Sequence, residues 1–325
     1  MLAYCTGIKP AGVRTYNVTD PETEKTQDRC TAAKMISLAV IILSSITISV
    51  TWSFHLVMRT YDNEDKVYNM SINPDGEVNE QINSILLTYP ELQNSEAHIR
   101  KSVQHRIRGI QLKEKLGLTD ACANLITDVD ASILHNYVNL SLSSTAAQGT
   151  TSNEKVIYAE TGSYVGCSSI LMASMFPPGT LVYSHDLWVD VAGGERLLDD
   201  GLPPPNYIEE DNYFYSFYDN VRRRGLEHAV IPIRGDSGFT LGLHRDESVT
   251  FGFIDGDHSY EGVTRDLRAM FPKIRPGGVL LLHDVIYAGE YINDAARALI
   301  DFCSMKNITC DFMLDGSEMA RVYKE

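Results

Sequence analysis

From about residue 154 onward, short apolar runs alternate with longer amphipathic stretches. The runs KVIYAE, LVYSHD, AVIPIRG, VTFGFIDGD and GGVLLLHD predict strands, and the stretches between them, at about 166–176, 212–225, 260–271 and 289–304, predict helices. Strands that alternate with helices predict a parallel sheet with helices on both faces. The last two runs, ITCDFML and MARVYK, have no helix between them and predict an antiparallel C-terminal edge.

The region before this sheet has a helical pattern instead. Apolar residues such as Ile82, Ile85 and Leu86 recur three or four positions apart up to about residue 143, and the small-residue segment 143–153 interrupts the pattern. We therefore expect a helical cap or lid that precedes the sheet domain. The predicted organisation is a polar tail at 1–34, a transmembrane helix at 35–58, a linker at 59–78, the helical cap at 79–150 and the sheet domain at 151–325.

The membrane span is predicted from the stretch Met35–Met58, which contains no Asp, Glu, Lys or Arg. Its length exceeds the ~20 residues that a helix needs to cross a bilayer. The run begins too far from Met1 for a signal peptide. A buried core helix is not expected either, because core helices rarely run this long without a charged face. More basic residues lie before the span than after it, which favours a type II orientation with a lumenal C-terminal domain, in the endoplasmic reticulum or Golgi. Glycosylation sequons downstream of the span give weak support, at Asn69, Asn139 and Asn307, although a further one lies upstream at Asn17.

Composition excludes some function classes. The chain is 44% apolar and 22% charged with a net charge of −15, which is typical of a globular protein and argues against nucleic-acid binding. Six cysteines occur without a C-x-x-C pair, so a structural zinc site is not expected. Cys303 and Cys310 are close enough in sequence to form a disulfide in an oxidising compartment, or they are two free thiols.

Polar residues gather where the predicted strands end, and ligands of parallel sheets bind at these carboxyl ends. The first strand runs into a loop that contains Gly162 and Gly166, which lets the backbone approach a ligand closely or serves only as a turn. The second strand ends in Asp186, an acid suited to ribose hydroxyls or to a helix cap. Asp236 follows the third strand and is equally suited to contact an adenine or to cap the next helix.

The fourth and fifth strands end in a denser group of ionisable residues. Asp255, Asp257 and His258 follow the fourth strand, and His283 and Asp284 follow the fifth. Neighbouring parallel strands bring Asp255 and Asp284 together, and two carboxylates suit a hard cation such as Mg²⁺. His258 is then a candidate general base, although either histidine alone could simply bond the backbone.

The ordered motifs ETGSYVGCSS, SHDLW, RGDS, FIDGDHSYEGV and RPGGVLLLHD resemble the class I S-adenosylmethionine-dependent methyltransferases. Among these, the chain is most similar to the macrocin-type sugar O-methyltransferases and the cephalosporin-pathway CmcI-like proteins. The resemblance covers about residues 154–325 and implies a Rossmann-like α/β fold.

The resemblance also implies roles by position. Asp186 would hold the ribose of S-adenosylmethionine, Asp236 would lie near its adenine, and His258 would act as the catalytic base. A divalent metal, Mg²⁺ or similar, would bind Asp255, His283 and Asp284, although the histidine departs from the acid or amide of the metal-dependent relatives. The other residues expected along the cofactor are Glu160, Gly162, Ser163, Gly166, Ser168, Ser237 and Asp255.

The expected function is therefore that of a membrane-anchored O-methyltransferase acting on a small-molecule or glycan acceptor, with a sugar hydroxyl favoured. Two alternatives stay open: a non-catalytic subunit of a membrane assembly, and a different, hydroxylase-like enzyme on the same fold. The polar insert Leu187–Asn212 and the helical segment are the expected lid over the acceptor. The motifs identify neither the acceptor nor an oligomeric state.

Overall fold

The computed structural model describes residues 52–59, 65–72, 77–118, 120, 122, 125–147, 155–188, 212–288, 291–312 and 317–324. All of them except Asn212 belong to one compact unit of the chain. The predicted tail at 1–34 and almost all of the insert Leu187–Asn212 lie outside the described residues.

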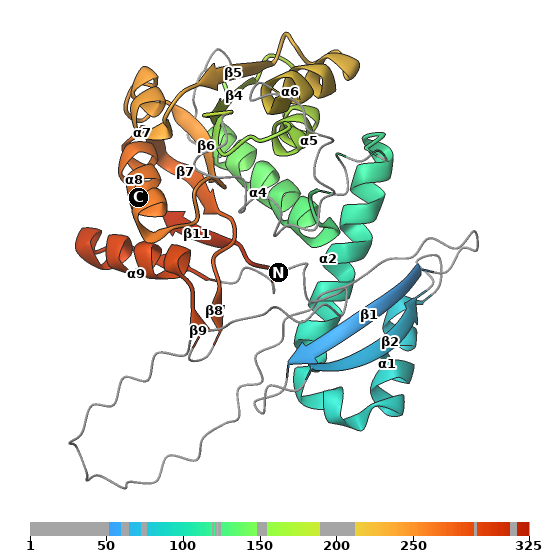
Figure 1. Cartoon of the computed structure of the whole chain (residues 1–325). Helices are drawn as coiled ribbons and strands as arrows, with labels where there is room; N and C mark the ends of the chain where they lie inside the picture. The colour runs from blue at the N-terminus through green and yellow to red at the C-terminus, as the bar shows by residue number, and fades with distance from the viewer. Residues whose placement is uncertain are drawn as a thin grey trace, which may run out of the picture. The chain divides into compact units, whose positions relative to one another are not determined.

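A seven-stranded sheet organises the C-terminal part, in the order β10-β11-β7-β6-β3-β4-β5 (Figure 1). Its strands are β3 (Ile157–Thr161), β4 (Leu181–Asp186), β5 (Val230–Arg234), β6 (Val249–Ile254), β7 (Ile274–Leu282), β10 (Cys310–Asp311) and β11 (Ala320–Tyr323). The five strands from β3 to β7 pair in parallel, whereas β11 pairs antiparallel with β7 and with β10. The mostly parallel sheet and its antiparallel C-terminal edge are thus confirmed.

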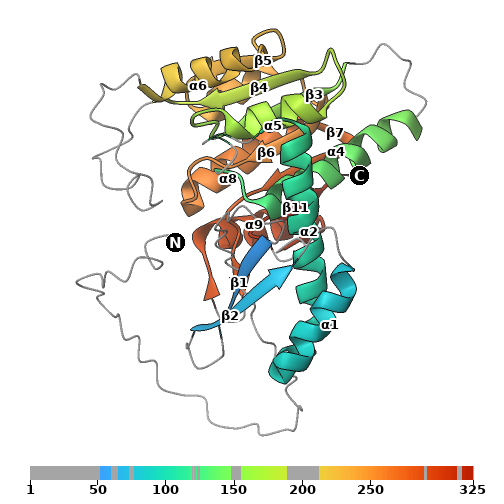
Figure 2. The same cartoon turned by 90° about the vertical axis from the view of Figure 1, so that its right-hand side faces the viewer.

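Helices cover both faces of this sheet (Figures 1 and 2). Alternate strand residues point to opposite faces, so Tyr158, Phe251 and Leu281 join one core and Ala159, Ile254 and Leu282 join the other. The first core packs against α4 (Asp128–Ala147), α5 (Cys167–Met175) and α6 (Asn212–Arg223), and the second against α8 (Tyr260–Met270) and α9 (Asp294–Lys306). The remaining elements of this part are α7 (Ser237–Thr240), the 3-10 helices η3 (Leu241–Leu243) and η4 (Phe271–Lys273), and a small hairpin of β8 (Tyr287–Ala288) and β9 (Tyr291–Ile292).

Helix α4 corrects the predicted domain boundary. It was assigned to a cap segment at 79–150, but its residues Ile133, Leu134 and Val138 are buried in the core that also holds strands β3, β6 and β7. The helix therefore belongs to the sheet domain, which begins before residue 151. The helical pattern was correct, but an amphipathic helix has the same pattern whether it forms a lid or a layer of the core.

The N-terminal part begins with a hairpin of β1 (Trp52–Arg59) and β2 (Asp65–Ile72), paired from Trp52↔Ile72 to Arg59↔Asp65. Helix α1 (Val78–Thr88), the 3-10 helix η2 (Pro90–Ser95) and α2 (Glu96–Lys115) follow, and a small core of their own contains Ile72, Ile82 and Ile99. Part of the predicted linker at 59–78 is therefore strand.

This hairpin also corrects the C-terminal end of the predicted transmembrane helix at 35–58. Residues 52–58 lie in strand β1, because their aromatic and β-branched side chains suit a strand as well as an apolar helix. Residues 35–51 lie outside the described residues. Within the residues that the structure describes, no helix combines the length and apolar character that a membrane span requires.

Two disulfides join described cysteines. One links Cys303 at the end of α9 to Cys310 in β10, so the bridge that the sequence left open is present. The other links Cys122 to Cys167, the first residue of α5, and was not predicted. The second bridge ties the residue after the glycine loop to the segment that leads into α4.

Candidate active site

The glycine loop follows β3 and lies directly against the end of β6. Gly162 has a φ of 81°, and a Cβ atom there would lie 2.0 Å from the Asp255 carbonyl oxygen. Gly166 has a φ of 85°, and a Cβ atom there would lie 2.8 Å from the Phe217 ring. Both glycines are thus required by positive φ and by close packing, which places the loop beside the acidic strand end.

Asp186 at the end of β4 holds this loop in place. Its carboxylate oxygens accept hydrogen bonds from the backbone N–H of Tyr164 at 2.7 Å and of Trp188 at 2.8 Å. The Trp188 indole also donates to the Tyr164 carbonyl oxygen at 2.7 Å and is buried against Phe217. Burial raises the pKa of Asp186, although the bonded amides partly oppose that shift. Trp188, the second residue of the predicted insert, thus packs into the core, a role that its sequence context did not indicate.

Glu160 is fully buried within β3 and belongs to a network of hydroxyl groups. Tyr158 donates a hydrogen bond to its carboxylate at 2.6 Å, and Ser169 donates another to the second oxygen. Burial raises the pKa of Glu160, and hydroxyls that include those of Ser163 and Ser168 act against the shift. Glu160 therefore supports the strand and the loop from inside the core, and a direct contact with a cofactor stays a prediction.

The residues after β5 have structural partners as well. Asp236 caps α7 by accepting a hydrogen bond from Gly238 N–H at 2.9 Å, so the capping alternative for this residue is confirmed. Its carboxylate also lies 3.6 Å from Arg265. Ser237 donates to the buried Asp266 at 2.5 Å. Contacts of Asp236 and Ser237 with a cofactor remain predictions.

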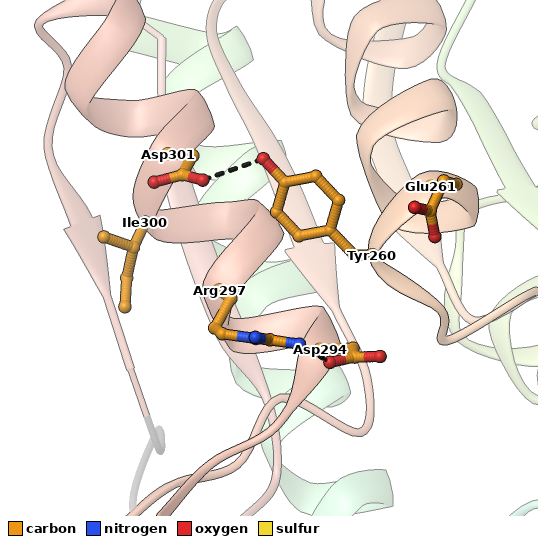
Figure 3. Close-up of a pocket in the computed structure, with 6 residues that line it drawn as sticks. All are labelled: Tyr260, Glu261, Asp294, Arg297, Ile300 and Asp301. Carbon is orange, nitrogen blue, oxygen red and sulfur yellow. Dashed lines mark hydrogen bonds and ion pairs between the residues drawn. The ribbon is translucent and has the colours of Figure 1, made fainter. Parts of the chain in front are cut away.

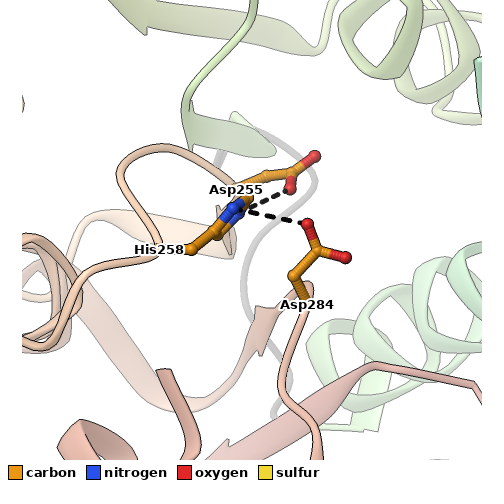
Figure 4. Close-up of side chains that lie close together, drawn as sticks. All are labelled: Asp255, His258 and Asp284. Atoms are coloured by element: carbon orange, nitrogen blue, oxygen red, sulfur yellow. Dashed lines mark ion pairs between the residues drawn. The ribbon is translucent and has the colours of Figure 1, made fainter. Parts of the chain in front are cut away.

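The ends of β6 and β7 bring charged groups face to face, as predicted. His258 lies 3.4 Å from Asp255 through Nε2 and 3.4 Å from Asp284 through Nδ1 (Figure 4). His283 Nδ1 lies 3.3 Å from an oxygen of each of the same two carboxylates. Asp257 is exposed instead and accepts a hydrogen bond from Ser259 N–H in the turn before α8.

These contacts determine the charge states of the site. Burial disfavours the charged form of Asp255, but His283 and His258 outweigh it and hold the pKa of this carboxyl below its ordinary value. Burial lowers the pKa of both imidazoles, but the neighbouring carboxylates outweigh it. The pKa of His258 is therefore raised, and that of His283 is raised further. The pKa of Asp284 is lowered because both imidazoles outweigh its burial. The carboxylates thus favour protonation of the two imidazoles, and the imidazoles favour ionisation of the two carboxyl groups.

Two more acids, neither of them among the predicted site residues, complete the cluster. Asp130 in the first turn of α4 lies 3.4 Å from His283 Nε2, across 153 positions of sequence. Glu318, next to β11, lies beside Asp284, and its burial and the charge of Asp284 raise its pKa. A capping pattern, Thr127-x-x-Asp130, could have marked the helix start, but no spacing rule connects it to the end of β7.

A divalent cation fits this cluster chemically. Ligand atoms of Asp255, His258 and Asp284 all lie within 4.8 Å of one another, and carboxylate and imidazole groups both serve as ligands of divalent cations. The group contains His258, expected as the base, whereas His283, expected as a ligand, contacts both carboxylates. The assignment of ligand and base between the two imidazoles therefore stays a prediction.

A separate pocket of about 440 Å³ opens between α8 and α9 (Figure 3). Its lining consists of Tyr260, Glu261, Asp294, Arg297, Ile300 and Asp301. The Tyr260 hydroxyl donates to Asp301 at 2.7 Å, so the two helices are bonded across it. The pocket shares no lining residue with the charged cluster.

One known family matches the central segment of the chain. Residues 159–285, from β3 to just after Asp284, match the model of a family described as a methyltransferase domain. The match includes the glycine loop, Asp186, Asp255, His258 and His283. No curated protein matches the sequence significantly.

Solved structures with a similar arrangement include the O-methyltransferase NovP, which is 15% identical over 61% of this chain and 81% of its own, with a TM-score of 0.44. A putative caffeoyl-CoA O-methyltransferase from Staphylococcus aureus is 14% identical over 66% and 97% of the two chains, with a TM-score of 0.41. A methyltransferase from Podospora anserina, solved with S-adenosylhomocysteine, is 11% identical over 67% and 88%, with a TM-score of 0.42. Similarities this low do not transfer an activity.

Proposed function

We propose that this chain, whose residues 159–285 match a methyltransferase domain, is an S-adenosylmethionine-dependent methyltransferase that methylates an oxygen atom of a sugar or glycan hydroxyl. The observation that carries the proposal is the cluster of Asp255, His258 and Asp284 beside the glycine loop. A hydroxyl is a weak nucleophile until its proton is removed, and this cluster offers an imidazole and two carboxylates for that purpose. The sugar is suggested by the family resemblance.

The cofactor is proposed to lie over the glycine loop. Backbone N–H groups at the start of α5 face the carboxyl edge of the sheet, where a ligand of a parallel sheet binds. In this arrangement Asp186 accepts hydrogen bonds from the ribose hydroxyls. Because its oxygens already accept bonds from Tyr164 and Trp188, the ribose would share or replace these amide partners.

Asp255 and Asp284 would hold a divalent cation, Mg²⁺ or Mn²⁺, with one imidazole as third ligand. When bound, the cation would supply positive charge that orients the acceptor hydroxyl and lowers its pKa. In the absence of that charge the carboxylates favour protonated imidazoles, and a protonated imidazole cannot accept a proton. The proposal therefore requires His258 to be neutral when the acceptor is bound.

The reaction is a direct displacement. A lone pair of the acceptor oxygen forms a bond to the methyl carbon of S-adenosylmethionine while the bond from carbon to sulfur breaks. The products are the methyl ether and S-adenosylhomocysteine, and the hydroxyl proton moves to His258. The protein contributes by alignment and by proton removal, for which a positioned base typically accelerates the reaction by about 10²–10⁴.

The test uses S-adenosylmethionine with a labelled methyl group, the purified protein and a panel of sugars and glycans, with products analysed for a gain of one CH₂. With a verified acceptor, His258→Ala should lower turnover by about 10²–10⁴, whereas the exposed His228 provides a matched control in His228→Ala. Full turnover in His258→Ala would show that the base assignment is wrong. Failure of the wild type to bind S-adenosylmethionine in calorimetry would favour a non-catalytic role.

The compartment is part of the same proposal: a membrane-anchored protein with its C-terminal domain in an oxidising lumen. The disulfides Cys122–Cys167 and Cys303–Cys310 support it, because such bonds are rare in reducing compartments. Since residues 52–58 form a strand, the anchor would lie within residues 35–51, near the short end of the range for a span. Expression in a secretory cell line, followed by alkylation of free thiols and glycosidase treatment, tests the orientation. Free thiols at all four cysteines and no glycosidase-sensitive shift would contradict it.

A further inference from the structure

The first turn of helix α4 reaches the candidate active site. Asp130 is buried, and one of its oxygens lies 3.4 Å from Nε2 of His283. Thr127 fixes this turn, because its hydroxyl accepts a hydrogen bond from Asp130 N–H at 3.1 Å and donates to the Asp130 carboxylate at 2.5 Å. Thr127 thus fixes both the backbone and the side chain of Asp130.

The other side of the His283 ring faces the site. Its Nδ1 lies 3.3 Å from Asp255 and 3.3 Å from Asp284, so the ring spans the distance between Asp130 and the two site carboxylates. When Nε2–H of His283 donates to the Asp130 carboxylate, Nδ1 is the nitrogen presented to the site. Carboxylates that orient a histidine in this way are common behind metal-binding and catalytic imidazoles.

The N-terminus of α4 and the basic side chains near it have partners other than the Asp130 carboxylate. Thr127 already caps α4, and Asp128, two residues before Asp130, pairs with Lys113 at 3.0 Å and with Arg106 at 3.7 Å. The two acids of this turn therefore have different partners, since Asp128 binds helix α2 and Asp130 faces His283. A buried carboxylate is costly unless a charged or polar partner compensates it, and His283 is such a partner.

We propose that Asp130 is a positioning residue, which holds His283 by Nε2 so that Nδ1 faces Asp255 and Asp284. This role deepens the proposed function and rests on it for its effect on cation binding and turnover. It also gives α4 a second role, because the helix then supplies a side chain to the site as well as a layer of the core.

The experiment compares Asp130→Asn and Asp130→Leu with the matched control Asp128→Asn in the same helical turn, all in the full chain. The first readout is the Kd for Mn²⁺, measured by electron paramagnetic resonance without cofactor or acceptor. The expected loss is about 10-fold for Asp130→Asn, which keeps an acceptor oxygen, and up to about 100-fold for Asp130→Leu, which has none. Asp128→Asn should lose thermal stability instead and keep its Mn²⁺ affinity within about 2-fold. The affinity for S-adenosylmethionine should be unchanged in all three, which shows that the domain is folded.

The second readout is the nitrogen NMR signal of the His283 ring in metal-free protein, assigned through His283→Gln. The Nε2 signal should shift in both Asp130 variants and stay in place in Asp128→Asn. An unchanged Nε2 signal, or equal loss of Mn²⁺ affinity in Asp128→Asn and Asp130→Asn, would overturn the proposal. If the wild type binds no Mn²⁺, the cation in the proposed function is wrong, and the NMR comparison alone decides the role of Asp130.

Discussion

The two halves of the sheet's carboxyl edge are built differently. At the ends of β3 and β4, each acid is bonded to neutral groups: Glu160 to the hydroxyls of Tyr158 and Ser169, and Asp186 to backbone amides. At the ends of β6 and β7, Asp255 and Asp284 face imidazoles at 3.3–3.4 Å instead. We call the first the neutral half, because its acids are bonded to uncharged groups that shape a loop. We call the second the charged half, because its acids are paired with imidazoles.

This difference separates what the two halves contribute. A carboxylate saturated by amides and hydroxyls stabilises the fold, because removing it leaves several buried donors without a partner. Carboxylates and imidazolium ions at a partly exposed strand end contribute less to stability, since desolvation offsets much of their attraction. Substitutions in the first half should therefore change stability and cofactor binding, and those in the second half should change chemistry.

The largest effect is expected for Gly162→Ala, at the junction of the two halves. The new Cβ atom would lie 2.0 Å from the Asp255 carbonyl oxygen, so the loop and the end of β6 must separate. We expect a loss of more than about 4 kcal/mol in the free energy of unfolding, with loss of S-adenosylmethionine binding, measured by urea denaturation and calorimetry.

Gly179→Ala is the matched control for this prediction. Gly179 has a φ of 91°, but no atom lies within 4 Å of the added Cβ, so only the backbone strain of about 1 kcal/mol should appear. If the two variants unfold with similar free energies, the close contact between the loop and β6 is not what requires glycine at position 162.

The second prediction concerns the charged half and separates stability from activity. Asp284→Asn should lower turnover by about 10²-fold or more, because it removes one of the two carboxylates that meet at the site. Its free energy of unfolding should stay within about 1 kcal/mol of wild type, since Asn tolerates the positive φ of 53° at this position and the desolvation of the carboxylate offsets much of its attraction to the imidazoles. Unfolding and turnover are measured on the same preparation. A loss of several kcal/mol in the free energy of unfolding of Asp284→Asn would show that Asp284 stabilises the fold, as the acids of the first half do.

These contrasts also explain how far the sequence predicted the molecule. The strand of residues 181–186 was predicted with its observed bounds, and the convergence of Asp255, His258, His283 and Asp284 followed from the pairing of neighbouring parallel strands. Local patterns suffice there because strand ends in one sheet share an edge. The contact of Asp130 with His283 depends on how α4 packs against the sheet, which no local pattern specifies. Residues 52–58 were predicted as membrane helix although they form a strand, because a short apolar run suits either element.

The third prediction returns to the neutral half. Asp186→Asn replaces one acceptor oxygen by a donor that faces backbone N–H groups, and should cost about 2–3 kcal/mol of stability. The affinity for S-adenosylmethionine should fall as well, because the loop loses the group that holds it. Asp246→Asn is the control: this exposed acid pairs with Lys273, and its loss should cost less than about 1 kcal/mol. Equal costs for the two variants would contradict a scaffold role for Asp186.

The smallest expected effect is a pH dependence that the neutral half imposes on the fold. His185, next to Asp186 in β4, is fully buried, and its ring nitrogens lie 2.9 Å from Thr240 and 2.9 Å from His244. Burial, and then the neighbouring His244, lowers the pKa of His185 to about 3. In the unfolded chain a histidine has a pKa of about 6.5, so between these values the unfolded state binds a proton that the folded state does not.

The sign of the effect follows from this proton. The contribution of His185 to stability is complete above about pH 6.5 and decreases as the pH falls toward 3, by about 2 kcal/mol between pH 7 and pH 5. Urea denaturation of the wild type and of His185→Gln at both pH values measures the contribution of His185 together with its contact to His244, because the remaining titrating groups are common to the two proteins. The variant should be less stable than wild type at pH 7, and the difference should shrink by about 2 kcal/mol at pH 5. A difference that stays constant with pH would mean that His185 titrates normally in the folded protein, and that this half of the edge is less tightly packed than its hydrogen bonds indicate.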